Sequence, residues 1–342
     1  MDQATMPPVL RDQLLDRRTR LEREIGRIGS EADLQRLLQE VDDALGRISA
    51  GTFGLCETCH DSIEPDRLLA DPLVRFCLDH LTSAEQRALE HDLQLAARIQ
   101  QTLLPGASLD FNGWQAAYHY RPARIVSGDY CDYIATDTGD FYFIVGDVSG
   151  KGVAASMLMA HLQAMFRALV PAGLPLNTLM ERVSRAFCES TLPSHYATLV
   201  CGRAAADGDV EICNAGHPPP LLISSAGIDG VEATGLPIGM FCTEQFGVSR
   251  VRMSAGDALL LCTDGVLEAE DGSGLEYGSD RLRAILAASQ HLAPPALIDV
   301  CVNDLASFLG GAPCGDDVTL MAIRRRADRP PLDQTGYDHA QA

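Results

Sequence analysis

Four aspartates, far apart along the chain, each stand where a mostly apolar segment meets a glycine or a turn. Asp129 lies in SGDYCD, Asp147 in VGDVSGKG, Asp264 in CTDGV and Asp316 in GDDVTL. A single aspartate in a turn is most often a cap or a turn former. Four carboxylates packed together would instead repel one another and raise their pKa values unless cations neutralise them. The pattern therefore predicts a fold that gathers strand ends around an oxygen-lined site for Mg²⁺ or Mn²⁺.

The Gly-Lys pair after Asp147 is similar to the phosphate loop of nucleotide-binding proteins but lacks its spacing. Such a loop needs four residues between its two glycines and a hydroxyl residue after the lysine. Here three residues separate Gly146 from Gly150, and Gly152 follows Lys151. We therefore interpret this turn as the carrier of a metal ligand and not as a nucleotide site.

The chain has 342 residues, of which 46% are hydrophobic, and this is enough for two or three domains. Residues 8–49 repeat apolar side chains at helical spacing, which predicts a helical hairpin. We expect an N-terminal module over 1–81 and a linker helix over 82–106. Alternating strands and helices predict the largest unit over 107–326, and the polar segment 327–342 is expected to be disordered.

The formal net charge of −20 disfavours nucleic acid as a partner, because an acidic surface repels phosphate. No apolar stretch approaches the length of a membrane-spanning helix, so we expect no membrane partner. The N-terminus has no basic leader followed by an apolar run, which is the pattern of a secretory signal. These features together predict a cytoplasmic location.

Three cysteines and a histidine form two close pairs of equal spacing, Cys56 with Cys59 and Cys77 with His80. Two such pairs close a tetrahedron of thiolate and imidazole ligands, which predicts one structural Zn²⁺. His60 is a poorer fourth ligand because its position cannot complete the second pair. The other cysteines are scattered among apolar residues and are expected to be reduced, buried thiols: Cys131, Cys188, Cys201, Cys213, Cys242, Cys262, Cys301 and Cys314.

Residues 34–81 resemble the DksA/TraR-type zinc-finger family, including the stretch RLLADP after the first cysteine pair. Members of that family usually carry a fourth cysteine where this chain has His80, which is also a zinc ligand. The family's regulators bind RNA polymerase through a long coiled coil with an acidic tip. The hairpin here is short, so the resemblance implies the zinc-finger fold without that activity.

The region from about 111 to 326 resembles the metal-dependent serine/threonine protein phosphatases (the PPM family), specifically the bacterial SpoIIE/RsbU-like branch. The matching motifs occur in the order SGDYCD, VGDVSGKGVAASMLMA, NAGHPPPLL, GLPIG, LLLCTDGVLEA and GDDVTLMAIRR. The resemblance implies an α+β fold in which two antiparallel β-sheets are sandwiched between α-helices. The segment LQLAARIQQTLLP resembles the linker helix that precedes this domain in the same branch.

The resemblance also implies roles for the acidic residues around two Mn²⁺ or Mg²⁺ ions. Asp147 bridges the two ions, and Asp264 and Asp316 hold the first. The backbone carbonyl of Val148 helps to hold the second, and Asp129 lies on that side. These four aspartates are the expected catalytic residues.

Five positions depart from the wider family or leave a choice open. Asp317 is a less favoured ligand than Asp316, because the family's ligand is the first residue of its motif. Ser149 stands where many relatives outside this branch have a histidine proposed as general acid. Arg124 lies near, but out of register with, their phosphate-binding arginine. His195 and His217 are candidates for proton transfer.

The predicted reaction is hydrolysis of phosphoserine or phosphothreonine in a protein by water activated at two metal ions, without a covalent phospho-enzyme. For the substrate, the resemblance implies a phosphorylated anti-sigma-factor antagonist. Branch members commonly act as dimers, and an apolar seam predicts that the linker helix pairs with its copy in a homodimer. The seam comprises Leu89, Leu93, Ala96, Gln100 and Leu103.

Two alternatives remain open from the sequence. Ser149 is compatible with a non-catalytic regulator that keeps a phosphatase-like domain. A transcription regulator that acts on RNA polymerase through its zinc finger is disfavoured by the short hairpin.

Overall fold

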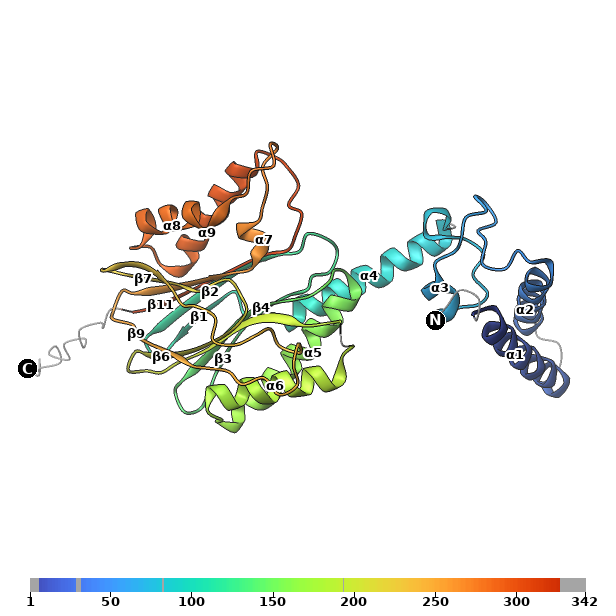
Figure 1. The fold of residues 1–342 in the computed structure, drawn as a ribbon, viewed down its shortest axis with the longest axis horizontal. Helices are drawn as coiled ribbons and strands as arrows, with labels where there is room; N and C mark the ends of the chain where they lie inside the picture. Colours follow the sequence, from blue (N-terminus) through green and yellow to red (C-terminus); the bar gives the residue numbers. More distant parts are fainter. Residues whose placement is uncertain (1–5, 29–31, 82, 193, 327–342) are drawn as a thin grey trace, which may run out of the picture. The chain divides into compact units, whose positions relative to one another are not determined.

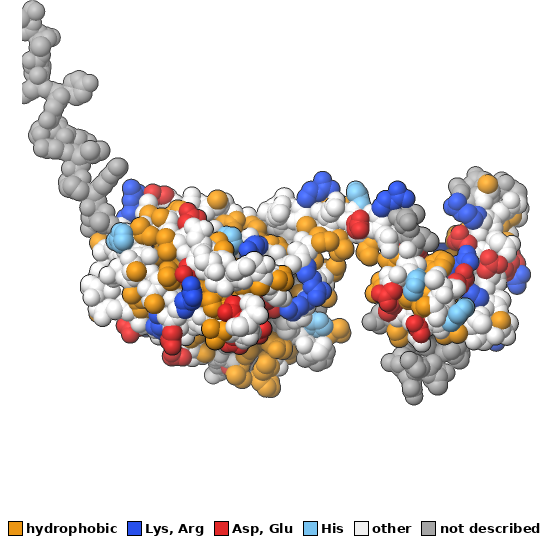
Figure 2. All heavy atoms as spheres, turned by 90° about the horizontal axis from the view of Figure 1, so that it is seen from above, with side chains coloured by type: hydrophobic (Ala, Val, Ile, Leu, Met, Phe, Trp, Pro, Cys, Tyr) orange, Lys and Arg blue, Asp and Glu red, His pale blue; other side chains and the backbone are white. Residues whose placement is uncertain are grey.

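The computed structural model describes residues 6–28, 32–81, 83–192 and 194–326 (Figure 1). The segment 327–342, expected to be disordered, lies outside these residues. The chain divides into two compact units, Met1–Asp92 and Leu93–Ala342. The expected linker helix, α4 (Ser83–Leu103), begins in the first unit and ends in the second. Figure 2 shows acidic, basic and apolar side chains interspersed on one face of the described surface.

The first unit begins with the predicted hairpin of α1 (Met6–Ile28) and α2 (Ala32–Ala50). Its apolar stripes face one another, and Leu14 and Leu21 are buried against Val41 and Ala44. The zinc-finger segment follows with α3 (Pro65–Ala70) and the short 3₁₀ helix η1 (Leu78–His80). Pro65 begins α3, where a missing N–H costs no helical hydrogen bond.

The second unit contains two antiparallel sheets, and each strand pairs with its sheet neighbours in the order given. The six-stranded sheet consists of β1 (Ser108–Phe111), β2 (Trp114–Arg121), β11 (Val318–Arg325), β10 (Ala258–Cys262), β7 (Leu221–Ser224) and β8 (Gly227–Gly230). The five-stranded sheet consists of β3 (Asp129–Ala135), β4 (Phe141–Val148), β5 (Ala197–Ala204), β6 (Asp209–Ala215) and β9 (Ser249–Arg252).

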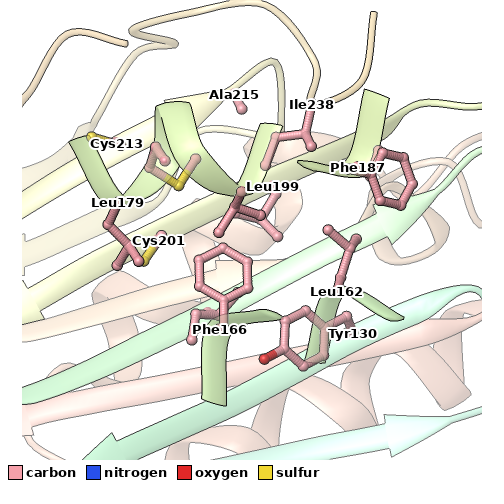
Figure 3. Close-up of a cluster of buried hydrophobic side chains, with 14 of the residues drawn as sticks. Tyr130, Leu162, Phe166, Leu179, Phe187, Leu199, Cys201, Cys213, Ala215 and Ile238 are labelled. Carbon is pink, nitrogen blue, oxygen red and sulfur yellow. The ribbon is translucent and has the colours of Figure 1, made fainter. Parts of the chain in front are cut away.

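Three apolar clusters hold these layers together. Side chains of both sheets, among them Phe143 and Met321, form the cluster between the sheets. The outer face of the five-stranded sheet packs against α5 (Val153–Leu169) and α6 (Leu176–Ser190), as Figure 3 shows. The outer face of the six-stranded sheet packs against α8 (Gly278–Ser289) and α9 (Pro294–Leu309). The predicted α+β fold of two antiparallel sheets between helices is therefore confirmed.

Strand β4 shows why this architecture positions the acidic residues. Its sequence FYFIVGDV is buried along almost its whole length, because it lies between the other sheet and the helices. A strand covered on both faces reads as a continuous apolar run and not as an alternating one. The run ends at Asp147, so the carboxylate stands where the strand leaves the core.

Helix α5, continued by η2 (Val170–Ala172), is long and apolar enough to cross a membrane by length and composition alone. Its apolar side chains are instead used within the unit. Met159, Leu162 and Phe166 are buried in the cluster with the five-stranded sheet. The core therefore accounts for one face of α5, while Val153 and Met157 are exposed.

The expectation that all scattered cysteines are reduced is wrong for Cys188 and Cys242. These two form a disulfide that joins α6 to the segment after Gly239, with their Cα atoms 5.4 Å apart. They are separated by 54 positions in the chain, so only the folded structure reveals the pairing. The other six are free thiols, namely Cys131, Cys201, Cys213, Cys262, Cys301 and Cys314.

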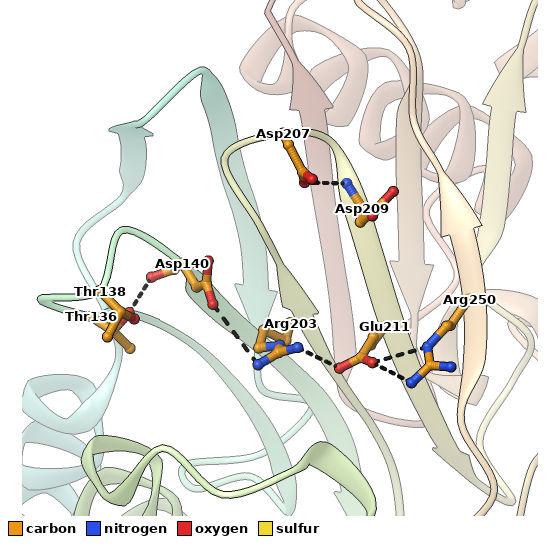
Figure 4. Close-up of polar contacts among 8 residues, drawn as sticks. All are labelled: Thr136, Thr138, Asp140, Arg203, Asp207, Asp209, Glu211 and Arg250. Atoms are coloured by element: carbon orange, nitrogen blue, oxygen red, sulfur yellow. Dashed lines mark hydrogen bonds and ion pairs between the residues drawn. The ribbon is translucent and has the colours of Figure 1, made fainter.

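An ion-pair network lies on the five-stranded sheet (Figure 4). Arg203 on β5 lies 2.9 Å from Glu211 and 3.9 Å from Asp140, and Glu211 also pairs with Arg250 at 3.0 Å. Such partly exposed pairs contribute about 0–1 kcal/mol each. These acidic side chains are already neutralised and form no part of the acidic site described below.

Replacing Phe166 by alanine tests the packing of α5. Phe166 is fully buried and its ring lies 6.1 Å from that of Tyr130, so Phe166→Ala should lower the free energy of unfolding by about 3–5 kcal/mol. Met157, on the same helix, is 68% exposed, and Met157→Ala should change it by less than about 0.5 kcal/mol. Denaturant unfolding followed by the fluorescence of the single tryptophan, the buried Trp114, measures both. Equal losses in the two variants would contradict this packing.

Candidate metal centre

The hairpin of β3 and β4 places the first two aspartates directly opposite one another. Asp129 begins β3 and pairs with Asp147 near the end of β4. Directly opposed residues on an antiparallel pair have neighbouring side-chain origins. Two carboxylates far apart in sequence thereby meet at one end of the five-stranded sheet.

The third and fourth aspartates come from the other sheet. Asp264 follows β10 and begins the one-turn helix α7 (Asp264–Leu267), while Asp316 lies just before β11. Strands β10 and β11 are antiparallel neighbours, so the end of one lies beside the start of the other. A Cβ atom at Gly265 would collide with the backbone carbonyl of Asp317, so glycine is required for this close approach.

The electrostatics show that these carboxylates converge. Burial raises the pKa of Asp147 to about 7, and the charges of Asp264, Asp316 and Asp317 add to the rise. The pKa of Asp264 is likewise raised, first by burial and then by Asp316. Like charges shift one another in this way only when they are close and poorly screened. The charges of Asp264 and Asp316 thus act on Asp147, and Asp129 faces Asp147 through the pairing of β3 with β4.

Gly128 leaves room beside two of the expected metal-binding oxygens. A Cβ atom at this position would lie 3.0 Å from the carbonyl oxygen of Val148 and 3.1 Å from Oδ1 of Asp147. These two oxygens therefore line the same small space next to the start of β3. A side chain at residue 128 would crowd both of them.

Asp129 is held more tightly than the other three. Its side chain is 1% exposed, and its Oδ2 accepts hydrogen bonds from the hydroxyl groups of Thr263, at 3.0 Å, and Thr319. Burial is the main cause that raises the pKa of Asp129, and Asp147 adds to it. Neither threonine is predicted from the sequence as a partner of Asp129. Only their positions could indicate this role, since Thr263 precedes Asp264 and Thr319 lies within the motif of Asp316.

Asp317, the less favoured metal ligand, holds nearby backbone in place. Its two carboxylate oxygens accept hydrogen bonds from the backbone N–H groups of Ala123, at 2.7 Å, and Gly128, at 3.0 Å. These bonds fix the segment that leads into β3. Asp316 instead accepts hydrogen bonds from the N–H of Asp317, at 3.0 Å, and from Nζ of Lys151, at 2.8 Å.

The linker helix contacts the same segment through Gln100. Its buried amide donates to the carbonyl of Ser127 at 2.7 Å and accepts from the N–H of Ser127 at 3.1 Å. Gln100 was expected in a seam between two copies of the chain. The structure uses it within one unit, where it fixes the residue two positions before Asp129.

The candidates for proton transfer differ in their burial and in their hydrogen bonds. Ser149 accepts a hydrogen bond from the N–H of Tyr196 at 3.0 Å. His217 is buried beside Thr198, and burial lowers its pKa to about 3, so it stays neutral and cannot act as an acid near neutral pH. His195 is partly exposed and lies 3.2 Å from the hydroxyl of Ser194. Cys131 is a fully buried thiol whose pKa is raised by burial.

The cysteine cluster assembles as the spacing predicted. The ligand atoms of Cys56, Cys59, Cys77 and His80 all lie within 4.8 Å of one another. The sulfur atoms of Cys59 and Cys77 are 3.8 Å apart, and Cys77 Sγ lies 3.2 Å from His80 Nδ1. Four protein ligands at this separation leave no open position, which is the arrangement of a structural zinc site.

Curated relatives match between half and about two thirds of this chain. Protein IcfG from Synechocystis sp. is 27% identical over 68% of this chain and 41% of its own length. The phosphoserine phosphatases RsbP and RsbU from Bacillus subtilis are 29% and 24% identical, over 52% and 70% of this chain and 46% and 72% of their own lengths. The chain thus spans less than half the length of the first two relatives.

Solved structures show the same fold. The RsbU and RsbW domains of Rv1364c from Mycobacterium tuberculosis are 32% identical, with a TM-score of 0.57 over 66% of this chain and 64% of that chain. The SiaA-PP2C domain of Pseudomonas aeruginosa superposes with a TM-score of 0.63 over 73% of this chain and 100% of that domain, at 20% identity. This second likeness is one of fold alone.

The fold and the converging acidic residues define a phosphatase domain of the PP2C type. Residues 137–326 match the family model of Stage II sporulation protein E (SpoIIE), and the chain belongs to this family. Residues 51–79 match the prokaryotic dksA/traR C4-type zinc finger, in which this chain supplies His80 beside three cysteines. Both resemblances inferred from the sequence are therefore confirmed.

Replacing one of the four expected ligands tests the zinc site of Cys56, Cys59, Cys77 and His80. Cys77→Ser should reduce the zinc content of the purified chain from about one ion to well below one, because structural sites need all four ligands. Cys314, a half-buried free thiol outside the cluster, provides the control, and Cys314→Ser should keep its zinc. Elemental analysis measures both. Full zinc content in Cys77→Ser would show that the cluster is not the binding site.

Proposed function

We propose that this chain is a metal-dependent protein serine/threonine phosphatase. The observation that carries the proposal is that Asp129 lies opposite Asp147 on β3 and β4, while the charges of Asp264 and Asp316, from the other sheet, act on Asp147. Membership of the SpoIIE family and the phosphoserine phosphatases among the relatives support it. The resulting reaction is the hydrolysis of a phosphomonoester on a protein side chain.

The residues present fit divalent metal ions. All the donors are carboxylate or carbonyl oxygens, which suit Mg²⁺ and Mn²⁺ better than zinc. Asp147 would bridge two ions, Asp264 and Asp316 would hold the first, and the carbonyl of Val148 and Asp129 would serve the second. Two such ions supply an activated water and offset charge on the phosphoryl group when bound.

The remaining residues hold this donor set in place. Thr263 and Thr319 orient Asp129, and Asp317 fixes the segment that leads into β3. Preorganised donors need no rearrangement when substrate arrives, and this is a large part of electrostatic catalysis. The Ser149 hydroxyl accepts a hydrogen bond from the N–H of Tyr196 and so holds the segment that follows Asp147.

We propose as substrate a regulatory protein that carries phosphoserine or phosphothreonine, of the anti-sigma-factor antagonist kind. Relatives whose names specify phosphoserine support the first part. The antagonist and a cytoplasmic location follow from the family resemblance and the sequence, and both stay predictions. A non-catalytic regulator is the second candidate, favoured by the serine at position 149.

Replacing the bridging aspartate distinguishes these two candidates. With Mn²⁺ and a phosphoserine peptide, the unchanged chain should release phosphate, and Asp147→Asn should be slower by roughly 10³-fold because the bridge between two ions is lost. Asp140→Asn, in the turn between β3 and β4 and in the ion pair with Arg203, should keep most of the activity. Tryptophan fluorescence of Trp114 checks folding. An inactive unchanged chain with Mn²⁺ bound would support the non-catalytic candidate.

We also propose that α4 pairs two copies of the chain. Its side chains Leu95 and Ile99 lie one helical turn apart and are 42% and 54% exposed. Gln100, part of the seam expected from the sequence, is bonded to Ser127, so the exposed pair offers the better contact. An exposed apolar stripe on a helix is typical of a surface that a second helix covers.

Charged substitutions on this stripe test the dimer. Leu95→Asp combined with Ile99→Asp should convert a dimer to a monomer, since two carboxylates would be buried between the helices. Light scattering gives the mass, and Arg98→Asp on the same helix provides a control for added charge. A mass that is the same in all three proteins would remove the proposal.

A further inference from the structure

Lys151 is the only lysine in the chain, whose 27 lysine and arginine residues are otherwise all arginine. It lies in the turn between β4 and α5, four residues after the bridging Asp147. The nucleotide-loop interpretation of this Gly-Lys pair fails on its spacing, and the metal-binding roles do not use the side chain. The single lysine therefore stands at the candidate centre without an assigned task.

Its ammonium group is bonded to a carboxylate that is expected to hold metal. Nζ donates to Oδ2 of Asp316 at 2.8 Å and to the carbonyl of Gly315 at 3.3 Å. The other oxygen, Oδ1, accepts the N–H of Asp317 at 3.0 Å. Both oxygens of Asp316 thus have partners. Oδ1 is bonded to a backbone N–H, and Oδ2 is bonded to the side chain of Lys151.

This ion pair is of a kind that exchanges readily. The side chains of Lys151 and Asp316 are 51% and 48% exposed. Exposed pairs are weak because water and salt screen them. The lysine ammonium is a compact charge on a flexible side chain, whereas an arginine would bind the carboxylate through two parallel hydrogen bonds. In a chain that otherwise uses arginine, lysine at this position therefore suits a basic group that has to leave the carboxylate of Asp316.

The backbone beside Lys151 is held by hydrogen bonds and by the shape of the turn. The N–H of Ser149 donates to the carbonyl of Tyr196 at 2.8 Å, and the N–H of Tyr196 donates to the Ser149 hydroxyl. Gly150 and Gly152, with φ of 96° and 79°, shape the turn on either side. The turn leads directly into α5, whose first N–H groups favour an anion.

Acidic side chains lie beside the place that a phosphate would enter. A hollow of about 440 Å³ beside Asp316 is lined by several acidic side chains, including Glu268, Glu270 and Asp271. A phosphomonoester carries up to two negative charges and would be repelled by them. Lys151 is bonded to Asp316, and the charge of the exposed Arg124 acts on Lys151, so both basic side chains lie near this carboxylate.

We propose that Lys151 is the phosphate-binding residue of this site, held on Asp316 until a divalent cation takes that carboxylate. This inference rests on the proposed function. With a divalent cation on Asp316, the ammonium of Lys151 would be released and could donate to a non-bridging oxygen of the phosphomonoester beside the start of α5. The divalent cation therefore binds before the phosphate. Each of the two ligands changes the affinity of the site for the other by the same factor.

The single lysine allows a direct test by nuclear magnetic resonance. A chain labelled with ¹³C-lysine gives one Cε signal, which reports on residue 151 alone. Adding Mg²⁺ should move this signal to its position in metal-free Asp316→Asn, where the ion pair is absent. Inorganic phosphate, added next, should move it again. Glu270→Gln, a neighbouring acid in the hollow, should leave the starting signal unchanged.

Calorimetry on two variants measures the coupling. Lys151→Met should bind Mg²⁺ several-fold more tightly, because no ammonium has to be displaced. The Mg²⁺-loaded variant should then bind inorganic phosphate roughly tenfold more weakly, since a charge-assisted hydrogen bond is lost. Lys151→Arg should keep phosphate binding but bind Mg²⁺ more weakly, because a guanidinium holds Asp316 with two bonds.

Either of two results overturns the inference. One is a lysine signal that stays in place while calorimetry records Mg²⁺ binding to the unchanged chain. The other is equal phosphate affinity in the unchanged chain and in Lys151→Met. Failure of the unchanged chain to bind Mg²⁺ at all would contradict the proposed function, and the inference would fall with it. The first two results leave the phosphatase assay intact, so the two failures are distinguishable.

Discussion

Repulsion between carboxylates held close together and away from water is the constraint on which the larger unit depends. Such groups cost free energy unless they are protonated or neutralised by cations. Burial first, and then the charges of Asp264, Asp316 and Asp317, raise the pKa of Asp147 to about 7. A fold keeps such an arrangement only when its sheets, helices and turns determine the positions of the charges more strongly than the repulsion displaces them.

The two sheets meet this requirement together. Asp129 begins a strand of one sheet, yet its carboxylate is bonded to threonines that adjoin β10 and β11 of the other. Asp317, beside β11, bonds back to the segment that leads into β3. These polar contacts cross between the layers whose apolar cluster lies behind them. Loosening the packing of the sheets would therefore alter the geometry of the acidic centre.

The sequence predicts what depends on local spacing and on strand ends. The zinc ligands follow from two equally spaced pairs, and the α1–α2 hairpin follows from its apolar period. The four aspartates follow from their places at the ends of apolar segments. Glycines at 128 and 265 could be noticed beside them, but the structure is needed to show which oxygens they let approach.

The contacts that the sequence does not reveal are those between side chains distant along the chain. The threonine partners of Asp129, the bonds of Asp317 and the Cys188–Cys242 disulfide all join separate elements. Gln100 shows a second cause of error. Its place in an apolar repeat suggested a contact between two chains, whereas its amide satisfies the backbone of Ser127 within one unit. Periodicity identifies a face of a helix but not what covers it.

Anomalous diffraction from a crystal grown with excess Mn²⁺ tests the central claim most directly. The account predicts two manganese peaks among the carboxylates of Asp147, Asp264 and Asp316, with the carbonyl oxygen of Val148 bound to one of them. The same carboxylates well separated, with no manganese between them, would contradict it.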